Sequence, residues 1–188
     1  YTRLSSNIQP KTAFLSRRQI LTAVKGLAAA LLWPSMGCTE TLPLRQTAPP
    51  MSTTLLDKDG KPVSIDAFGG MPILINFWAT WCPPCVAELP ALDRASHRLA
   101  GEAQILLISV DRSGSKKASQ FLEDRGISRP HFAFDKKGAL SREMGVRGLP
   151  TSFLLTADQR HCWVYEGPRD WDDIAMIKEL RQLLDGQA

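Results

Sequence analysis

Residues 71–90, MPILINFWATWCPPCVAELP, join an apolar run to a helical pattern across two cysteines that stand two residues apart. The run over residues 71–79 is almost continuously apolar, which is typical of a central strand buried on both faces of a sheet. After the second cysteine, leucine and alanine residues recur at helical spacing. The stretch therefore predicts a buried strand followed by a helix, with Cys82 and Cys85 at the start of that helix.

Strands and helices alternate along the rest of the chain. The patterns predict strands over residues 103–111 and 131–135, a hairpin over 52–65, a second hairpin over 151–167 with its turn near Asp158, and helices over 64–70, 115–126, 139–145 and 172–184. Ser115 is the expected N-cap of its helix, and Gly126 is the expected stop. This order predicts an α/β fold, a three-layer sandwich around a central mixed sheet.

The charge of the chain is unevenly distributed. The formal net charge is +4, but residues 1–38 hold five Lys and Arg residues and no acid. The remaining residues carry 18 basic against 19 acidic side chains. A nearly neutral body gives no reason to expect nucleic-acid binding.

The basic amino-terminal segment has the pattern of an export signal. Arg17 and Arg18 precede a modest apolar stretch over residues 20–33, which Lys25 interrupts and which is short for a bilayer-spanning helix. SRRQIL is similar to a twin-arginine signal, although Ile and Thr replace the usual Phe and Lys. An ordinary secretory signal or a short membrane anchor is the alternative. We expect residues 1–38 to be an export signal or anchor, and the protein to be periplasmic or otherwise extracytoplasmic.

The end of this segment leaves two interpretations open. Cys38 follows Gly37 as at a lipoprotein cleavage site, although Ser35 stands where such a site prefers Leu. Cys38 is therefore either a lipid-bearing first residue or a spectator in a discarded peptide. Residues 39–50 are Pro-rich and non-periodic and predict a linker, and residues 51–188 form the predicted globular domain.

The Cys82–Cys85 pair could bind zinc, close a structural disulfide or perform redox chemistry. Zinc sites bring a second Cys or Cys/His pair at short spacing, whereas here Cys38 and Cys162 are distant and the three histidines are scattered. A structural disulfide across so short a loop removes little chain entropy. Redox chemistry fits better, because the free N–H groups and dipole of a helix N-terminus favour a thiolate at Cys82.

The two prolines between the cysteines suit this position. Pro83 fits the first helical turn, where its missing N–H costs nothing, and Pro84 stiffens the loop. Cys85 lies one turn into the helix and is expected to be the more buried of the two cysteines. Cys82 can then attack a partner disulfide, and Cys85 can resolve the mixed disulfide.

Three separated motifs carry a family resemblance. FWATWCPPC at residues 77–85, Pro90 in the following helix and GVRGLPTSFLL at residues 145–155 together resemble the thioredoxin fold, within its AhpC/TSA and redoxin-like branch. The match is closest to the exported thiol–disulfide reductases of the TlpA/ResA/DsbE type and covers roughly residues 50–186. The resemblance implies a thioredoxin fold with an N-terminal β-hairpin extension and an extra strand–helix element, for which residues 104–126 provide enough chain.

The resemblance also implies roles for individual residues. Cys82 is the expected nucleophile, Cys85 the resolving thiol, and Pro150 a cis-proline facing the disulfide. The backbone beside this proline pairs with an extended substrate segment. The side chains expected to contact the substrate are Trp81, Pro83, Pro84, Leu149 and Thr151. Thr151 departs from the cytochrome-maturation members of the DsbE branch, which often have an acid there.

Two polar residues near the pair need interpretation. Glu88 lies one helical turn after Cys85, where the resemblance implies an acid that tunes the thiols and relays a proton; otherwise it is a solvated helix acid. Asn76 stands where cytosolic thioredoxins have a buried Asp, and it either leaves proton relay to Glu88 or water, or simply forms hydrogen bonds in the core. Cys162 is expected to be a buried spectator, with a regulatory thiol as the alternative.

The resemblance implies an enzyme, a protein disulfide reductase with no cofactor and no bound metal. Its partners would be disulfide-containing proteins, either apocytochrome c or a copper-site assembly protein, and a membrane thiol donor that resupplies electrons. Any membrane association would run through the amino-terminal segment. Three alternatives are a copper-binding chaperone, although these use a Cys-x-x-x-Cys pair with a distant His, a peroxidase, and a disulfide donor.

Overall fold

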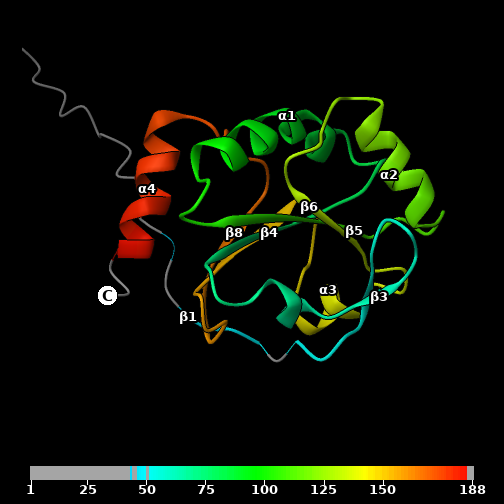
Figure 1. Cartoon of the computed structure of the whole chain (residues 1–188), viewed down its shortest axis with the longest axis horizontal. Coiled ribbons are helices and arrows are strands. Elements are labelled where there is room, and N and C mark those ends of the chain that lie inside the picture. Colours follow the sequence, from blue (N-terminus) through cyan, green and yellow to red (C-terminus); the bar gives the residue numbers. More distant parts are fainter. Residues whose placement is uncertain (1–42, 44–45, 50, 186–188) are drawn as a thin grey trace, which may run out of the picture. The chain divides into compact units, whose positions relative to one another are not determined.

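The computed structural model describes residues 43, 46–49 and 51–185. The predicted export segment and the possible lipidation site at Cys38 lie outside these residues. The described part of the chain folds around a single mixed sheet with helices on both faces, as the alternation of elements predicted (Figure 1).

Eight strands form the sheet in the order β1-β8-β7-β4-β5-β6-β2-β3. Strand β4 lies at the centre, parallel to β5 and antiparallel to β7. The strand bounds are β1 Gln46–Thr47, β2 Leu55–Leu56, β3 Pro62–Val63, β4 Ile73–Trp78, β5 Gln104–Ser109, β6 His131–Phe134, β7 Thr151–Leu155 and β8 His161–Glu166.

The helices divide between the two faces of the sheet (Figure 1). One face is covered by α1, α2 and α4, whose apolar side chains share one core cluster. The other face is covered by α3 and a single 3-10 turn, η1. The bounds are η1 Ile65–Phe68, α1 Pro83–Arg98, α2 Ser115–Glu123, α3 Ala139–Glu143 and α4 Ile174–Asp185. The predicted three-layer α/β/α architecture is confirmed.

Strand β4 is the central strand that leads directly to the cysteine pair. All six of its residues are buried, as its apolar run predicted. Because successive side chains of a strand alternate between faces, Leu74 and Trp78 pack toward α1, while the core under α3 receives Ile73, Ile75 and Phe77. Asn76 shares the face of Leu74 and Trp78. The one polar side chain of this strand therefore points toward α1.

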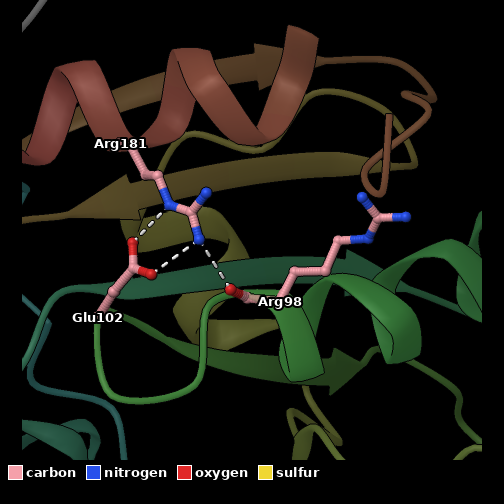
Figure 2. Close-up of polar contacts among 3 residues, drawn as sticks. All are labelled: Arg98, Glu102 and Arg181. Carbon is pink, nitrogen blue, oxygen red and sulfur yellow. Dashed lines mark hydrogen bonds and ion pairs between the residues drawn. The ribbon is translucent and has the colours of Figure 1, made fainter. Parts of the chain in front are cut away.

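Polar contacts attach α4 to α1 at two places, one just before α4 begins and one in its later turns. Arg94 of α1 forms an ion pair with Asp172, just before α4. Near the other end, Arg181 donates to both carboxylate oxygens of Glu102, at 2.7 and 2.8 Å, and to the carbonyl of Arg98 at 3.0 Å (Figure 2). These contacts dock α4 against the later turns of α1 and the turn that follows it.

Three local details differ from the sequence predictions. Gly114, not Ser115, occupies the N-cap of α2, because the chain enters the helix at a φ of 107°, which glycine adopts without strain. Within the predicted linker, Gln46 and Thr47 form strand β1, which pairs with the edge of β8. Helix α4 begins at Ile174, two residues after the predicted start. None of the helices in the described ranges reaches the length and hydropathy needed to cross a membrane.

Candidate active site

The cysteine pair lies at the start of α1, directly after the central strand. Cys82 is the N-cap residue, Pro83 and Pro84 begin the helix, and Cys85 lies in its first turn. A disulfide joins Cys82 to Cys85, and the amide of Cys85 donates to the sulfur of Cys82 at 3.4 Å. Cys85 is fully buried and Cys82 is 5% exposed. A thiolate at Cys82 would therefore face the free N–H groups of a helix N-terminus.

A buried carboxylate anchors the loop that precedes the pair. Asp111, just after β5, accepts hydrogen bonds from the amide of Thr80 at 3.0 Å and from its hydroxyl at 2.7 Å. The hydroxyl of Ser109 donates to the same carboxylate at 2.8 Å. Beyond this anchor, Trp81 is 68% exposed beside Cys82. Sequence reasoning did not identify Asp111, although an acid directly after a buried strand is a signal for such a role.

Pro150 directly precedes β7, the strand next to β4, at the same end of the sheet. The Leu149–Pro150 peptide bond is cis, as expected from the resemblance. The register pairs Thr151 with Phe77, so this proline lies at the end of the sheet from which the chain continues to Cys82. The amide of Gly167 donates to the carbonyl of Pro150 at 2.9 Å, which joins the proline loop to the end of β8.

The residues expected to contact the substrate differ in accessibility. Trp81, Pro83 and Pro84 are exposed. Leu149 is half-buried and packs against the core, and Thr151 is buried, with its hydroxyl donating to the carbonyl of Gly148 at 2.8 Å. A hollow of about 280 Å³ lies beside the proline and is lined by Arg147, Gly148, Leu149, Pro150, Thr151, Glu166 and Gly167.

Glu88 is a buried carboxylate, not a solvated helix acid. It is 4% exposed, and it lies one turn after Cys85 on the inner side of α1. Oε1 accepts from Nδ2 of Asn76 at 2.7 Å, and Oε2 accepts from the amide of Arg169 and from Nε1 of Trp171, both at 3.0 Å. Burial raises the pKa of Glu88, and these three donors together with the charge of Arg169 oppose that rise.

Asn76 connects Glu88 to the neighbouring strand. Its Nδ2 also donates to the hydroxyl of Ser152 at 2.9 Å, the residue opposite it on β7. Among the described residues, its Oδ1 is buried and has no hydrogen-bond partner. Hydrogen bonding in the core, one of the two interpretations of Asn76, is thus observed. Ser152 and Trp171 were missed, because each lies far along the chain from its partner, which is Asn76 for Ser152 and Glu88 for Trp171.

Cys162 lies away from this cluster. It is buried in the core on the α3 face of the sheet, whereas Cys82 and Cys85 belong to the core on the α1 face. Burial raises the pKa of its thiol, and Nε2 of Gln46 donates to its sulfur at 3.7 Å. Within the described ranges, no three His, Cys, Asp or Glu side chains are grouped as metal ligands.

The chain is similar to proteins of a known family. The Redoxin family model matches residues 43–184. The chain belongs to the Redoxin family. Thiol-disulfide oxidoreductase ResA of Bacillus cereus is 30% identical over 150 residues, which cover 79% of this chain and 84% of that protein. Thiol:disulfide interchange protein DsbE of Vibrio cholerae is 32% identical over 120 residues, which cover 63% of this chain and 62% of that protein.

A solved structure with a related sequence shows the same fold. The crystal structure of a thiol:disulfide interchange protein of the thioredoxin family from Chlorobium tepidum superposes with a TM-score of 0.57 at 29% identity, covering 71% of this chain and 95% of that one. The predicted thioredoxin fold is confirmed. This Redoxin-family chain is a thiol–disulfide oxidoreductase of the ResA/DsbE type, as the sequence resemblance implied.

Proposed function

We propose that this Redoxin-family chain is an exported reductase of protein disulfides that works through Cys82 and Cys85. The observation that carries the proposal is the position of the pair at the N-terminus of α1, with Cys82 at the N-cap and Cys85 buried behind it. The relatives named ResA and DsbE support thiol–disulfide exchange. The direction of electron flow is the proposed part.

The reaction begins from the reduced pair. The Cys82 thiolate attacks one sulfur of a substrate disulfide, breaking that bond and forming a mixed disulfide, while the other substrate sulfur leaves as a thiolate and takes up a proton. The Cys85 thiol then loses its proton and attacks the Cys82 sulfur. The substrate leaves with two thiols, and the protein keeps the Cys82–Cys85 disulfide. A thiol donor in the membrane returns two electrons and two protons.

Glu88 is the proposed acceptor for the Cys85 proton. It is buried one helical turn from Cys85, and burial holds its pKa above the ordinary value of 4.5. A carboxylate with a raised pKa is a better match for proton transfer near neutral pH than an exposed one. The proposed substrate contacts are the backbone of Leu149, beside Pro150, and the exposed side chains on either side of Cys82, which are Trp81, Pro83 and Pro84.

The proposed substrates are the haem-site cysteines of apocytochrome c or the cysteines of a copper-site assembly protein. Both are dithiols that an oxidising compartment would convert to disulfides. The support for an extracytoplasmic location is the arginine pair and apolar stretch within residues 1–38. Fusing residues 1–50 to a reporter enzyme that is active only after export tests this location. An inactive reporter would contradict it.

The reduction potential of the Cys82–Cys85 pair is the first test of the proposed function. We expect a value near or below about −230 mV after equilibration with glutathione or dithiothreitol, in the range of thioredoxin and glutaredoxins. A value near about −120 mV, like that of a strong periplasmic oxidant, would instead make this protein a disulfide donor. Copper binding by the reduced pair, or turnover of peroxide, would point to the chaperone or peroxidase alternatives.

Single-cysteine variants test the order of attack. Cys85→Ser should accumulate a mixed disulfide with a substrate protein, because Cys82 can attack but the complex cannot be resolved. Cys82→Ser should trap none. Equal trapping by both variants would show that the two cysteines do not have separate roles. Using apocytochrome c and a copper-site protein as competing substrates distinguishes the two proposed substrate classes.

A further inference from the structure

The segment between β8 and α4 connects two parts of the active site. At one end, the amide of Gly167 donates to the carbonyl of Pro150 at 2.9 Å. Two and four residues later, the amide of Arg169 and Nε1 of Trp171 both donate to Oε2 of Glu88 at 3.0 Å. Five consecutive residues therefore join the backbone of the cis-proline to the buried carboxylate of α1.

Trp171 is held firmly in this arrangement. Its side chain is fully buried, and its ring packs edge-on against Tyr165 with the ring centres 5.4 Å apart. The hydroxyl of Tyr165 donates to Glu179 of α4 at 2.8 Å. The next residue, Asp172, forms an ion pair with Arg94 of α1. Contacts on both sides of the indole thus fix the direction of its N–H.

The effect of the Trp171 N–H on Glu88 depends on the other groups around this carboxylate. The charged and titratable groups from the elements packed there are the guanidinium of Arg169, the phenol of Tyr165 behind the indole, its partner Glu179, the Arg94–Asp172 pair, and the cysteines of α1. Asn76 and Ser152 add neutral polar groups from the sheet. Three groups donate to Glu88: the side chain of Asn76, the backbone amide of Arg169 and the indole of Trp171. The indole N–H can be removed by a substitution that keeps an apolar ring in the same buried place.

We propose that Trp171 is a positioning residue for disulfide exchange, which holds the Glu88 carboxylate in its ionised form and in place beside the cysteine helix. The effect of Trp171 on catalysis rests on the proposed function. The hydrogen bond from Trp171 to Glu88 is observed and does not depend on that function. The neutral, flat indole is suited to the role, because it donates one hydrogen bond without bringing a second charge into the core. Removing this N–H leaves Oε2 with one donor, so the ionised form of Glu88 becomes less favourable.

The test is Trp171→Phe, which keeps an aromatic ring against Tyr165 and removes the N–H. Glu88 is titrated through its carboxyl carbon by NMR in the oxidised protein, a readout that needs no activity. We expect about a tenfold decrease in the ionisation constant of Glu88, the size of one lost charge-assisted hydrogen bond. The acidic limb of the pH profile for reduction of insulin disulfides should move to higher pH. In a Glu88→Gln background, Trp171→Phe should leave the profile unchanged.

Tyr165→Phe is the matched control. It removes the bond to Glu179 but keeps the ring against the indole, the Arg94–Asp172 ion pair and the indole N–H, so Glu88 should titrate as in the wild type. The proposal is overturned when Glu88 titrates alike in wild type and Trp171→Phe, or when Tyr165→Phe produces the same shift. If Trp171→Phe does not fold, the indole N–H resonance of the wild type is followed by NMR as the pH changes. Its chemical shift should change with the same midpoint as Glu88. An indole resonance that does not change at that midpoint overturns the proposal.

These readouts separate the inference from the proposed function. A shifted Glu88 titration with normal exchange but an unmoved pH profile overturns the catalytic part of the inference. A shifted titration with no exchange activity in any variant, wild type included, overturns the proposed function and confirms the contact between Trp171 and Glu88.

Discussion

Replacing the buried carboxylate of Glu88 by an amide is the most informative perturbation of this site. In Glu88→Gln, the amide oxygen can take the place of Oε2 and still accept from Arg169 and Trp171. The new NH2 group then faces Nδ2 of Asn76. Because Oδ1 of Asn76 has no partner among the described residues, a half-turn of the Asn76 amide brings an acceptor to this NH2, and the Ser152 hydroxyl can donate to the same oxygen. We therefore expect Glu88→Gln to fold.

The stability difference between wild type and Glu88→Gln should depend on pH. Burial raises the pKa of Glu88 in the folded protein above 4.5, so the folded state binds the proton more tightly than the unfolded state. The contribution of Glu88 to the free energy of unfolding is then fully present below pH 4.5 and is lost as the pH rises to the folded pKa. Within that window it falls by about 1.4 kcal/mol per pH unit. Glutamine has no such dependence.

Urea unfolding of the two oxidised proteins from about pH 4 to about pH 8 measures this difference. The free energy of unfolding of Glu88→Gln minus that of the wild type should rise with pH and then become constant. Carboxylates whose pKa is lowered in the folded state act equally on both proteins and cancel; they are Glu102, Glu143, Asp158 and Asp172. A flat or falling difference curve would refute this description of Glu88.

Glu88→Ala is the control for the hydrogen bonds themselves. It removes both acceptor oxygens and leaves three donors, from Asn76, Arg169 and Trp171, without this partner. An unsatisfied buried donor costs about 1–3 kcal/mol, so Glu88→Ala should lose at least about 3 kcal/mol near neutral pH. If Ala and Gln at this position were equally stable, the three contacts would contribute nothing measurable.

Two further predictions concern Asp111 and Cys162. Asp111→Ala should lose about 2 kcal/mol or more in urea unfolding, because the amide and hydroxyl of Thr80 and the hydroxyl of Ser109 lose their acceptor, and insulin reduction should slow as the loop before Cys82 loosens. Asp111→Asn, which keeps one acceptor oxygen, should lose less, and an unchanged Asp111→Ala would contradict the anchoring role. With the Cys82–Cys85 disulfide intact, the Cys162 thiol should react with a thiol reagent only after unfolding, because it is buried and its pKa is raised. Comparison with Cys162→Ser isolates this one thiol, and fast labelling of the folded protein would support the regulatory alternative.

The sequence predictions were most reliable where one local pattern decides one element. The apolar run before Cys82 predicted β4, and the cysteines and prolines that follow predicted the start of α1. Predictions were weaker where the backbone conformation matters more than the side chain. Ser115 has the right chemistry for an N-cap, but the chain enters α2 through Gly114 at a positive φ. A Pro-rich stretch without periodicity gave no sign of β1, because two residues can pair with an edge strand without any pattern.

At the active site, the surroundings of Glu88 could also not be predicted from the local sequence. Its position one turn after Cys85 indicated an acid near the pair, but whether it was buried depended on what covers α1. The covering groups come from 81 and 83 residues away, at Arg169 and Trp171, and Asn76 lies opposite Ser152 only because β4 and β7 are antiparallel in this register.

The amino-acid sequence by itself determined the alternation of strands and helices and the place of Cys82 and Cys85 at a helix start, because these depend on apolar periodicity and on residues close along the chain. Only the tertiary structure decided the environment of Glu88. Desolvation and hydrogen bonding depend on which distant groups the sheet register and the docking of α4 bring to one point, and no local pattern encodes that meeting.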